Sequence, residues 1–219
     1  MRSSQSFGLS PRVTFPVSRL VVDPERFRND DDEPMAARGM GAIYTRLSTG
    51  EPLRVLCETE RGRLMKTYYD PHHTKLENAA ADALMRFDHC LIIDVHSFSS
   101  TPLPHEPDQT APRPELCIGF DQFHSPFDDP AEVWRICEEN RFSLDLNRPF
   151  SGSIVPHRYW NADQRVRSFM LEIRRDLYMD EATGLKRTDF SAFACQLCAL
   201  IEVLVVAGLT QKRSLIESQ

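Results

Sequence analysis

CLIIDVH, the stretch from Cys90 to His96, decides the fold class of this chain. It is a continuous apolar run that turns polar only at its end, which is typical of a strand covered on both faces. The preceding stretch, TKLENAAADALMRF from Thr74 to Phe87, places apolar residues at helical intervals with polar residues between them. A helix that leads into a buried strand indicates an α/β protein.

The same order of helix and strand returns further along the chain. A helix is predicted from Pro130 to Asn140, leading into the strand-like FSLDLN. The strand SFMLEIR, Ser168 to Arg174, precedes a last helix over roughly Phe190 to Val206, whose almost wholly apolar surface predicts burial. Alternating helices and buried strands predict a sheet between helix layers, with functional sites at the carboxyl ends of its strands.

The N-terminal part of the chain is less regular. The short β-branched stretch VSRLVVD, Val17 to Asp23, is a predicted strand that ends at Pro-Glu. Acidic residues and turn glycines between Arg28 and Gly50 predict an irregular segment. We expect a short N-terminal segment over residues 1–16, one domain over residues 17–210 and a C-terminal tail over residues 211–219, because 219 residues suit a single domain with a sizeable core.

Charge and composition exclude several classes of partner. The net charge of -6 repels phosphate backbones and anionic lipid surfaces, so neither nucleic acid nor a membrane is an expected partner. No apolar run approaches the roughly 20 residues of a membrane helix, and MRSSQSFGLSPRV lacks the apolar stretch of a secretory signal, which predicts a cytoplasmic protein. The six scattered cysteines are therefore expected to be reduced, without a structural disulfide.

His96 is the best single candidate for chemistry, because a strand that ends in Asp-Val-His projects an imidazole into the crevice at its carboxyl end. Asp94 lies on the same strand face by the period of two, and a carboxylate beside a metal-bound histidine commonly supports it. The alternative is a core or loop histidine that is satisfied by hydrogen bonds, since a short D-x-H motif alone is not specific.

Glu172 lies in the apolar strand around Phe169 to Ile173. Because an unpaired buried carboxylate is costly, Glu172 must pair, bind a metal, or act as an acid or base. The alternative is a buried salt bridge with Arg174 or Arg175. The sequence alone favours neither a functional role nor a salt bridge for Glu172.

Arg19 and Arg26 bracket the predicted strand VSRLVVDPER. A guanidinium fork has the right chemistry to hold a substrate carboxylate bidentately. The alternative is surface ion pairing with Glu25 or with the acidic cluster from Asp30 to Glu33. Arg26, like His96 and Glu172, lies near the end of a predicted strand.

Two further residue pairs invite functional readings. Adjacent side chains such as His72 and His73 rarely face one ion, so a helix start or a substrate-contacting loop is favoured over a metal site. Cys195 and Cys198 have redox spacing, but they lie inside an apolar helix and not at a helix start after a strand. Core packing is therefore favoured over a thiol-based redox function.

Seven blocks in order resemble the N-formylglutamate amidohydrolases: SRLVVDPERF, EPMAARGMGAIYTR, YYDPHH, LIIDVHSFSSTPLP, RPELCIGFD, RPFSGSIVP and MLEIRRDLYMD. They run from about Val17 to Asp180. The resemblance implies a three-layer α/β sandwich with a mixed central sheet. It also implies hydrolysis of a small carboxylate-bearing substrate such as N-formyl-L-glutamate to formate and glutamate, and hence a role in amino-acid catabolism and histidine degradation.

The resemblance also implies roles for single residues. His96 matches a zinc ligand at a strand end, and Glu172 corresponds to the carboxylate that activates the zinc-bound water. Arg26 corresponds to the arginine that grips the substrate carboxylate, and Arg19 assists it. Asp94 is the expected carboxylate support of His96.

The chain departs from the family pattern at its start. Family members carry a His-Ser-Gly-like strand end and a further acidic motif before the SRLVVDPER block, and Met1 to Pro16 contains neither. We therefore expect a chain that lacks the N-terminal metal-binding segment and its first strand or strands. Catalytic zinc needs about three protein ligands, so replacements for the missing ones are sought in four residues: His72, His73, Asp121 and His124.

Two functional hypotheses follow from this departure. One is a zinc-dependent amidohydrolase, and the alternative is a catalytically inactive truncated relative that binds an acidic amino-acid derivative. A lost central strand would expose sheet edges and apolar surface, and formation of a homo-oligomer would compensate for it.

Overall fold

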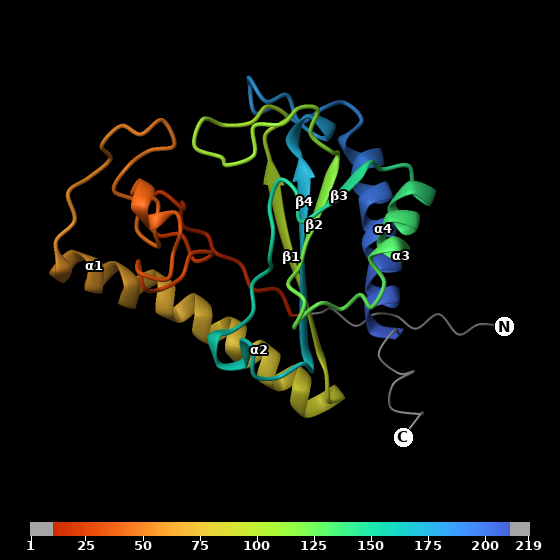
Figure 1. Ribbon diagram of the computed structural model, residues 1–219, viewed down its shortest axis with the longest axis horizontal. Coiled ribbons are helices and arrows are strands. Elements are labelled where there is room, and N and C mark those ends of the chain that lie inside the picture. The colour runs from red at the N-terminus through yellow and green to blue at the C-terminus, as the bar shows by residue number, and fades with distance from the viewer. Residues whose placement is uncertain (1–10, 211–219) are drawn as a thin grey trace. The chain divides into compact units, whose positions relative to one another are not determined.

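The computed structural model describes residues 11–210, which divide into two compact units (Figure 1). The N-terminal unit is Met1–Asp82 and the C-terminal unit is Ala83–Gln219. The division falls inside helix α2 (Asp70–Phe87), which agrees with the helix expected from residue 74 and begins one turn earlier. The single domain expected over residues 17–210 stays a prediction.

Helices dominate the second half of the N-terminal unit. The 3-10 helix η1 (Ala36–Arg38) lies in the segment that was expected to be irregular. Helix α1 (Glu58–Leu64), the π-helical turn η2 (Met65–Tyr69) and α2 then follow without a break. A buried cluster that includes Val22, Ala42 and Ile43 packs against residues of α1 and η2.

The strand predicted over residues 17–23 is wrong. The backbone turns there, and the carbonyl of Ser18 accepts a hydrogen bond from the N–H of Val21 at 2.8 Å. The β-branched character of this stretch serves core packing, because Val22 is fully buried. Arg26 therefore does not follow a strand end.

A mixed four-stranded sheet forms the centre of the C-terminal unit (Figure 1). Its strands β1 (Cys90–Phe98), β2 (Leu116–Gly119), β3 (Leu144–Leu146) and β4 (Val166–Arg174) lie in the order β1-β4-β2-β3. Strand β4 runs parallel to β1 and antiparallel to β2, whereas β2 and β3 are parallel. This arrangement confirms the predicted α/β class with a mixed central sheet.

The two long strands differ in burial. The first eight residues of β4 are all buried, as expected of an apolar strand between two neighbours. Coverage of β1 on both faces was also predicted, and that prediction is wrong. Because β1 is at the edge of the four-stranded sheet, most of it is half-buried and Val95 is 54% exposed.

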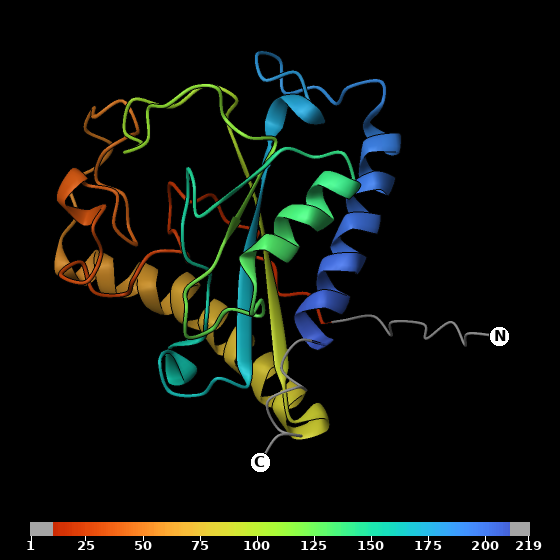
Figure 2. The ribbon, with the colours of Figure 1, turned by 45° about the vertical axis from the view of Figure 1, so that its right-hand side comes forward.

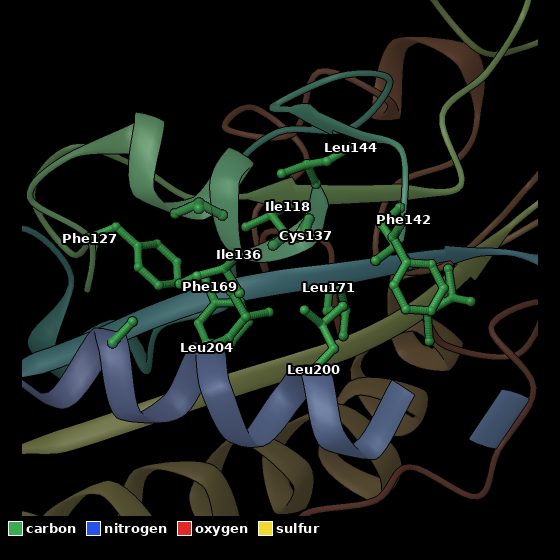
Figure 3. Packing of buried hydrophobic residues seen from close by; sticks show 14 residues of the cluster. Ile118, Phe127, Ile136, Cys137, Phe142, Leu144, Phe169, Leu171, Leu200 and Leu204 are labelled. Atoms are coloured by element: carbon green, nitrogen blue, oxygen red, sulfur yellow. The ribbon is translucent and has the colours of Figure 1, made fainter. Parts of the chain in front are cut away.

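Helices α3 (Pro130–Glu139) and α4 (Phe190–Thr210) pack together against the sheet (Figure 2). The start of α3 is defined by Asp129, whose side chain accepts a hydrogen bond from the N–H of Ala131 at 2.9 Å. The core between these helices and the sheet interleaves apolar side chains from both (Figure 3). Its members include Leu116, Ile118, Val133, Ile136, Phe169, Leu171, Leu200 and Leu204.

Helix α4 departs from the expected full burial. Only Leu200, Leu204, Ala207 and Gly208 are buried in it, and Cys195 and Cys198 are exposed, which contradicts their predicted core packing. By length and composition, α4 is long and apolar enough to cross a membrane, contrary to the expectation that no segment is. Core helices of soluble proteins share this length and composition.

Candidate active site

His96 and Asp94 lie two residues apart on β1, so both side chains project from the same face of the sheet. The Nε2 atom of His96 is 2.8 Å from Oδ1 of Asp94. Both side chains are largely buried, with 24% of His96 and 13% of Asp94 exposed. The structure thus places the predicted histidine and its predicted carboxylate in direct contact.

Glu172 is the neighbour of His96 in the sheet. The register of β1 and β4 pairs His96 with Glu172, and residues paired in this way project to the same side. Glu172 is only 8% exposed. Strands β1 and β4 thus bring together the imidazole of His96 and the carboxylates of Asp94 and Glu172 near the carboxyl ends of parallel strands. Along the chain, Asp94 and Glu172 are 78 residues apart.

The row of side chains continues across the other two strands. Glu172 is paired with Cys117 on β2, and Cys117 is paired with Asp145 on β3. Cys117 is fully buried, and its Sγ donates a hydrogen bond to the carbonyl of Phe150 at 3.2 Å. Burial raises the pKa of the Cys117 thiol to about 11, and the charges of Glu172 and Asp145 act in the same direction. A neutral thiol therefore separates the two carboxylates.

The arginines that follow Glu172 have other partners. Nε of Arg174 donates to Asp176 at 2.7 Å, and a second nitrogen donates to the carbonyl of Arg113. Arg175 donates to Ser97 at 3.0 and 3.2 Å. The buried salt bridge from Arg174 or Arg175 to Glu172, which was the alternative interpretation of Glu172, is not among these contacts.

Sequence reasoning missed a buried arginine beneath the loop that follows β1. Arg113 is 4% exposed, forms an ion pair with Glu106 and donates to the carbonyl of Ser99 at 2.8 Å. Its guanidinium carbon lies 5.2 Å from the ring centroid of Phe98 and 5.6 Å from that of Phe150. Arg113 thus fixes the loop between β1 and β2, and no periodic pattern in the sequence marks this arginine.

Arg19 and Arg26 surround a buried carboxylate in the N-terminal unit. Asp23 is fully buried, lies 3.1 Å from Arg19 and 3.5 Å from Arg26, and accepts a hydrogen bond from the hydroxyl of Tyr44 at 2.7 Å. Arg26 also lies 3.5 Å from Glu33, which is the ion pairing with the acidic cluster given as an alternative. Burial, with the charge of Asp23, raises the pKa of Tyr44.

The histidine pair lies in the first turns of α2, in agreement with the predicted helix start. Nε2 of His73 is 3.0 Å from the carbonyl of Pro24, and its ring stacks on Tyr69 at 4.1 Å. The ring of His72 packs edge-on against Phe15 at 5.2 Å. Both side chains therefore take part in packing within their unit.

His124 cannot serve as a replacement metal ligand. It is fully buried, its Nε2 accepts a hydrogen bond from the N–H of Asn161 at 2.9 Å, and its Nδ1 donates to the carbonyl of Val166 at 2.7 Å. Both ring nitrogens are thus engaged in hydrogen bonds within the protein. Oδ1 of Asp121 accepts from the backbone N–H of His124 at 2.9 Å, so this pair stabilises a turn.

An imidazole beside carboxylates at the strand ends of an α/β sheet is the class of site with which hydrolases move protons and bind metals. The model of one hydrolase family, N-formylglutamate amidohydrolase, matches residues 2–179 of the chain. The chain belongs to the N-formylglutamate amidohydrolase family. The resemblance of the seven sequence blocks is thereby confirmed.

Solved structures agree with this assignment. The chain is similar to an N-formylglutamate amidohydrolase from Ralstonia eutropha JMP134, with 25% identity, a TM-score of 0.72, and coverage of 89% of this chain and 75% of that one. A gene product of Agrobacterium tumefaciens shares the fold, with 16% identity, a TM-score of 0.55, and coverage of 86% and 68%. No curated protein matches the chain.

Proposed function

We propose that this chain is a zinc-dependent amidohydrolase that cleaves the amide of an N-acyl acidic amino acid such as N-formyl-L-glutamate. The observation that carries the proposal is the pairing of His96 with Glu172 across β1 and β4, with Asp94 2.8 Å from the imidazole, in a member of this family.

His96 and Asp94 supply two donor groups of the kinds that a divalent metal ion accepts. Zinc accepts imidazole nitrogen and carboxylate oxygen ligands, and His96 with Asp94 offers this donor set on one face of β1. His96 would hold the ion, with Asp94 orienting the imidazole. A zinc ion held there would polarise the amide carbonyl and lower the pKa of a water molecule towards neutrality.

Glu172 is the proposed acid and base. Its carboxylate takes a proton from the water molecule that attacks the formyl carbon. It then returns the proton to the nitrogen of the leaving amine, as the bond between carbon and nitrogen breaks. Formate and glutamate are the products. The low exposure of Glu172 keeps competing water away from this proton.

Arg26, assisted by Arg19, is the proposed holder of a substrate carboxylate. Nε and Nη1 of Arg26 face Asp23 and Glu33, so its remaining nitrogen is the donor for this contact. Its side chain is 26% exposed. Asp23 has a positioning role in this proposal, since it holds both guanidinium groups on one buried carboxylate.

The test is formate release from N-formyl-L-glutamate by this chain, with added zinc and with a chelator in parallel. Glu172→Gln keeps the size of the side chain and removes the proton acceptor, so turnover should fall about 100-fold or more. The matched control is Glu138→Gln on the exposed face of α3, which should retain full activity.

The outcomes separate the two functional hypotheses. Turnover that needs zinc and is lost in Glu172→Gln supports the amidohydrolase. A folded chain that binds glutamate or its N-formyl derivative without releasing formate would support the binding role instead. The cytoplasmic location, the part in histidine degradation and the homo-oligomer stay predictions.

A further inference from the structure

The guanidinium of Arg113 lies on the same side of the sheet as His96. Phe98 follows His96 by two residues on β1, so both side chains project from one face of the strand. The guanidinium carbon of Arg113 is 5.2 Å from the ring centroid of Phe98, which is within the range of a cation–π contact. Arg113 therefore contacts the side chain that comes directly after His96 on this face.

The main chain of Arg113 is bound to β4 at the same level. Phe98 is paired with Arg174 in the register of β1 and β4, and Arg174 follows Glu172 by two residues on one strand face. A terminal nitrogen of Arg174 donates a hydrogen bond to the carbonyl of Arg113. Arg113 thus contacts both strands of the candidate site, in each case two residues beyond its reactive side chain.

A second aromatic ring connects Arg113 with β2. The guanidinium carbon is 5.6 Å from the ring centroid of Phe150, and the rings of Phe98 and Phe150 meet edge to face at 5.8 Å. The carbonyl of Phe150 accepts the hydrogen bond of the Cys117 thiol. Because Cys117 is paired with Glu172, the position of the Phe150 main chain bears on the neighbour of that carboxylate.

The segment that carries Phe150 lies directly on β2. A Cβ atom at Gly119 would come within 2.5 Å of the carbonyl oxygen of Gly152, so this close approach requires glycine at position 119. A displacement of Phe150 is therefore passed on to β2 and to Cys117.

Arg113 is itself held in a fixed orientation. Its side chain is almost completely buried, and its Nη1 donates to the carbonyl of Ser99 at 2.8 Å. Its Nη2 donates to the buried carboxylate of Glu106. Lysine would keep the charge at this position, but it has no planar group to lie against two rings and to donate to two acceptors in a fixed geometry.

We propose that Arg113 is a positioning residue, which keeps His96 and Glu172 in the relative position that proton transfer requires. It acts through the rings of Phe98 and Phe150, and the inference rests on the proposed function for the reaction that is measured. Since a misplacement of about 1 Å can cost about 100-fold in rate, Arg113 should affect kcat and not substrate binding.

The test is the rate of formate release from N-formyl-L-glutamate by Arg113→Lys, with thermal melting as the check of folding. The variant should lower kcat about 10- to 100-fold and change KM less than about threefold. The matched control is Arg165→Lys, in an exposed arginine that immediately precedes β4 and pairs with Asp88 and Asp163. It should keep both constants. Unchanged kcat in folded Arg113→Lys, a rise in KM alone, or an equal loss in the control would overturn the proposal.

A second variant tests the contact through the ring and does not depend on the folding of the first. Phe150→Leu keeps the arginine and removes the ring edge, so it should also lower kcat with little change in KM. The double variant Arg113→Lys/Phe150→Leu should lose little more than the larger single loss, because both changes act on one contact. Losses that multiply, or full kcat in Phe150→Leu, would contradict the proposed action of Arg113.

NMR of the imidazole rings keeps the positioning of His96 apart from turnover. The ring signals of His96 are assigned by their absence in His96→Gln. They should move in Arg113→Lys and stay in place in Arg165→Lys. If the wild type releases no formate but this pattern is found, the amidohydrolase proposal fails and the positioning of His96 by Arg113 is supported. Unchanged His96 signals in folded Arg113→Lys overturn the positioning role whether or not the wild type is active.

Discussion

Replacing Asp23 by Asn tests the electrostatic centre of the N-terminal unit. The amide keeps the shape of the side chain and one acceptor oxygen, so the Tyr44 hydroxyl keeps a neutral acceptor, while the charge and the acceptor for the N–H of Glu25 are lost. A hydrogen bond to a charged acceptor contributes about 1.5–3 kcal/mol and one to a neutral acceptor about 0.5–1.5, a loss of about 1–1.5 kcal/mol. Arg26, with 26% exposure, adds about 1 kcal/mol, and Arg19, with 55%, adds at most about 0.5.

The sum is a destabilisation of about 2–3 kcal/mol, which corresponds to a fall in Tm of about 4–12 °C for a chain of this size. Thermal unfolding followed by far-UV circular dichroism measures it. Tyr44→Phe is the matched control, because it removes only the hydroxyl and should cost about 1–2 kcal/mol. A change in Tm of less than about 2 °C in Asp23→Asn would refute the reasoning that a buried charge organises this cluster.

Three further predictions concern stability and reactivity. Phe169→Ala in the core beneath α4 should cost about 3–5 kcal/mol in urea denaturation, whereas Phe87→Ala at an exposed site should cost about 0.5 or less. Burial raises the pKa of Tyr69 to about 12, so its contribution to the free energy of unfolding is complete below about pH 10 and is lost as the pH rises towards 12. Urea denaturation between pH 9 and about pH 11 should show a shallower loss in Tyr69→Phe. In the native chain a thiol reagent should label the exposed cysteines quickly and the buried ones only on unfolding: Cys57, Cys195 and Cys198 against Cys90, Cys117 and Cys137.

The periodic parts of the fold could be predicted from the sequence. Helices α2 and α3 and strands β1 and β4 appear where the apolar patterns place them, because burial on one face or on both leaves a direct mark on the sequence. The short β-branched stretch around Val22 misled the prediction. Val22 is buried by packing against helices and loops. The β-propensity of its residue type does not distinguish this burial from burial in a strand.

Only part of the candidate site could be predicted from the sequence. The sequence indicates His96, Asp94 and Glu172 because polar side chains at the end of an apolar strand are costly to bury unless they are paired or functional. Their pairing across two strands depends on register, which periodicity within each strand does not give. Arg175 was considered only as a salt-bridge partner of Glu172, since nothing in the sequence shows which residue its guanidinium meets.

The alternation of side chains along β4 links stability with chemistry in a way that restricts evolution. Glu172 and its flanking residues Leu171 and Ile173 face opposite sides of one strand, and the flanking residues belong to the core. The loss or gain of one codon within β4 would turn the carboxylate into that core and move an apolar side chain into its place. Point substitutions can therefore accumulate in this strand, but length changes should be confined to the loops that connect the strands.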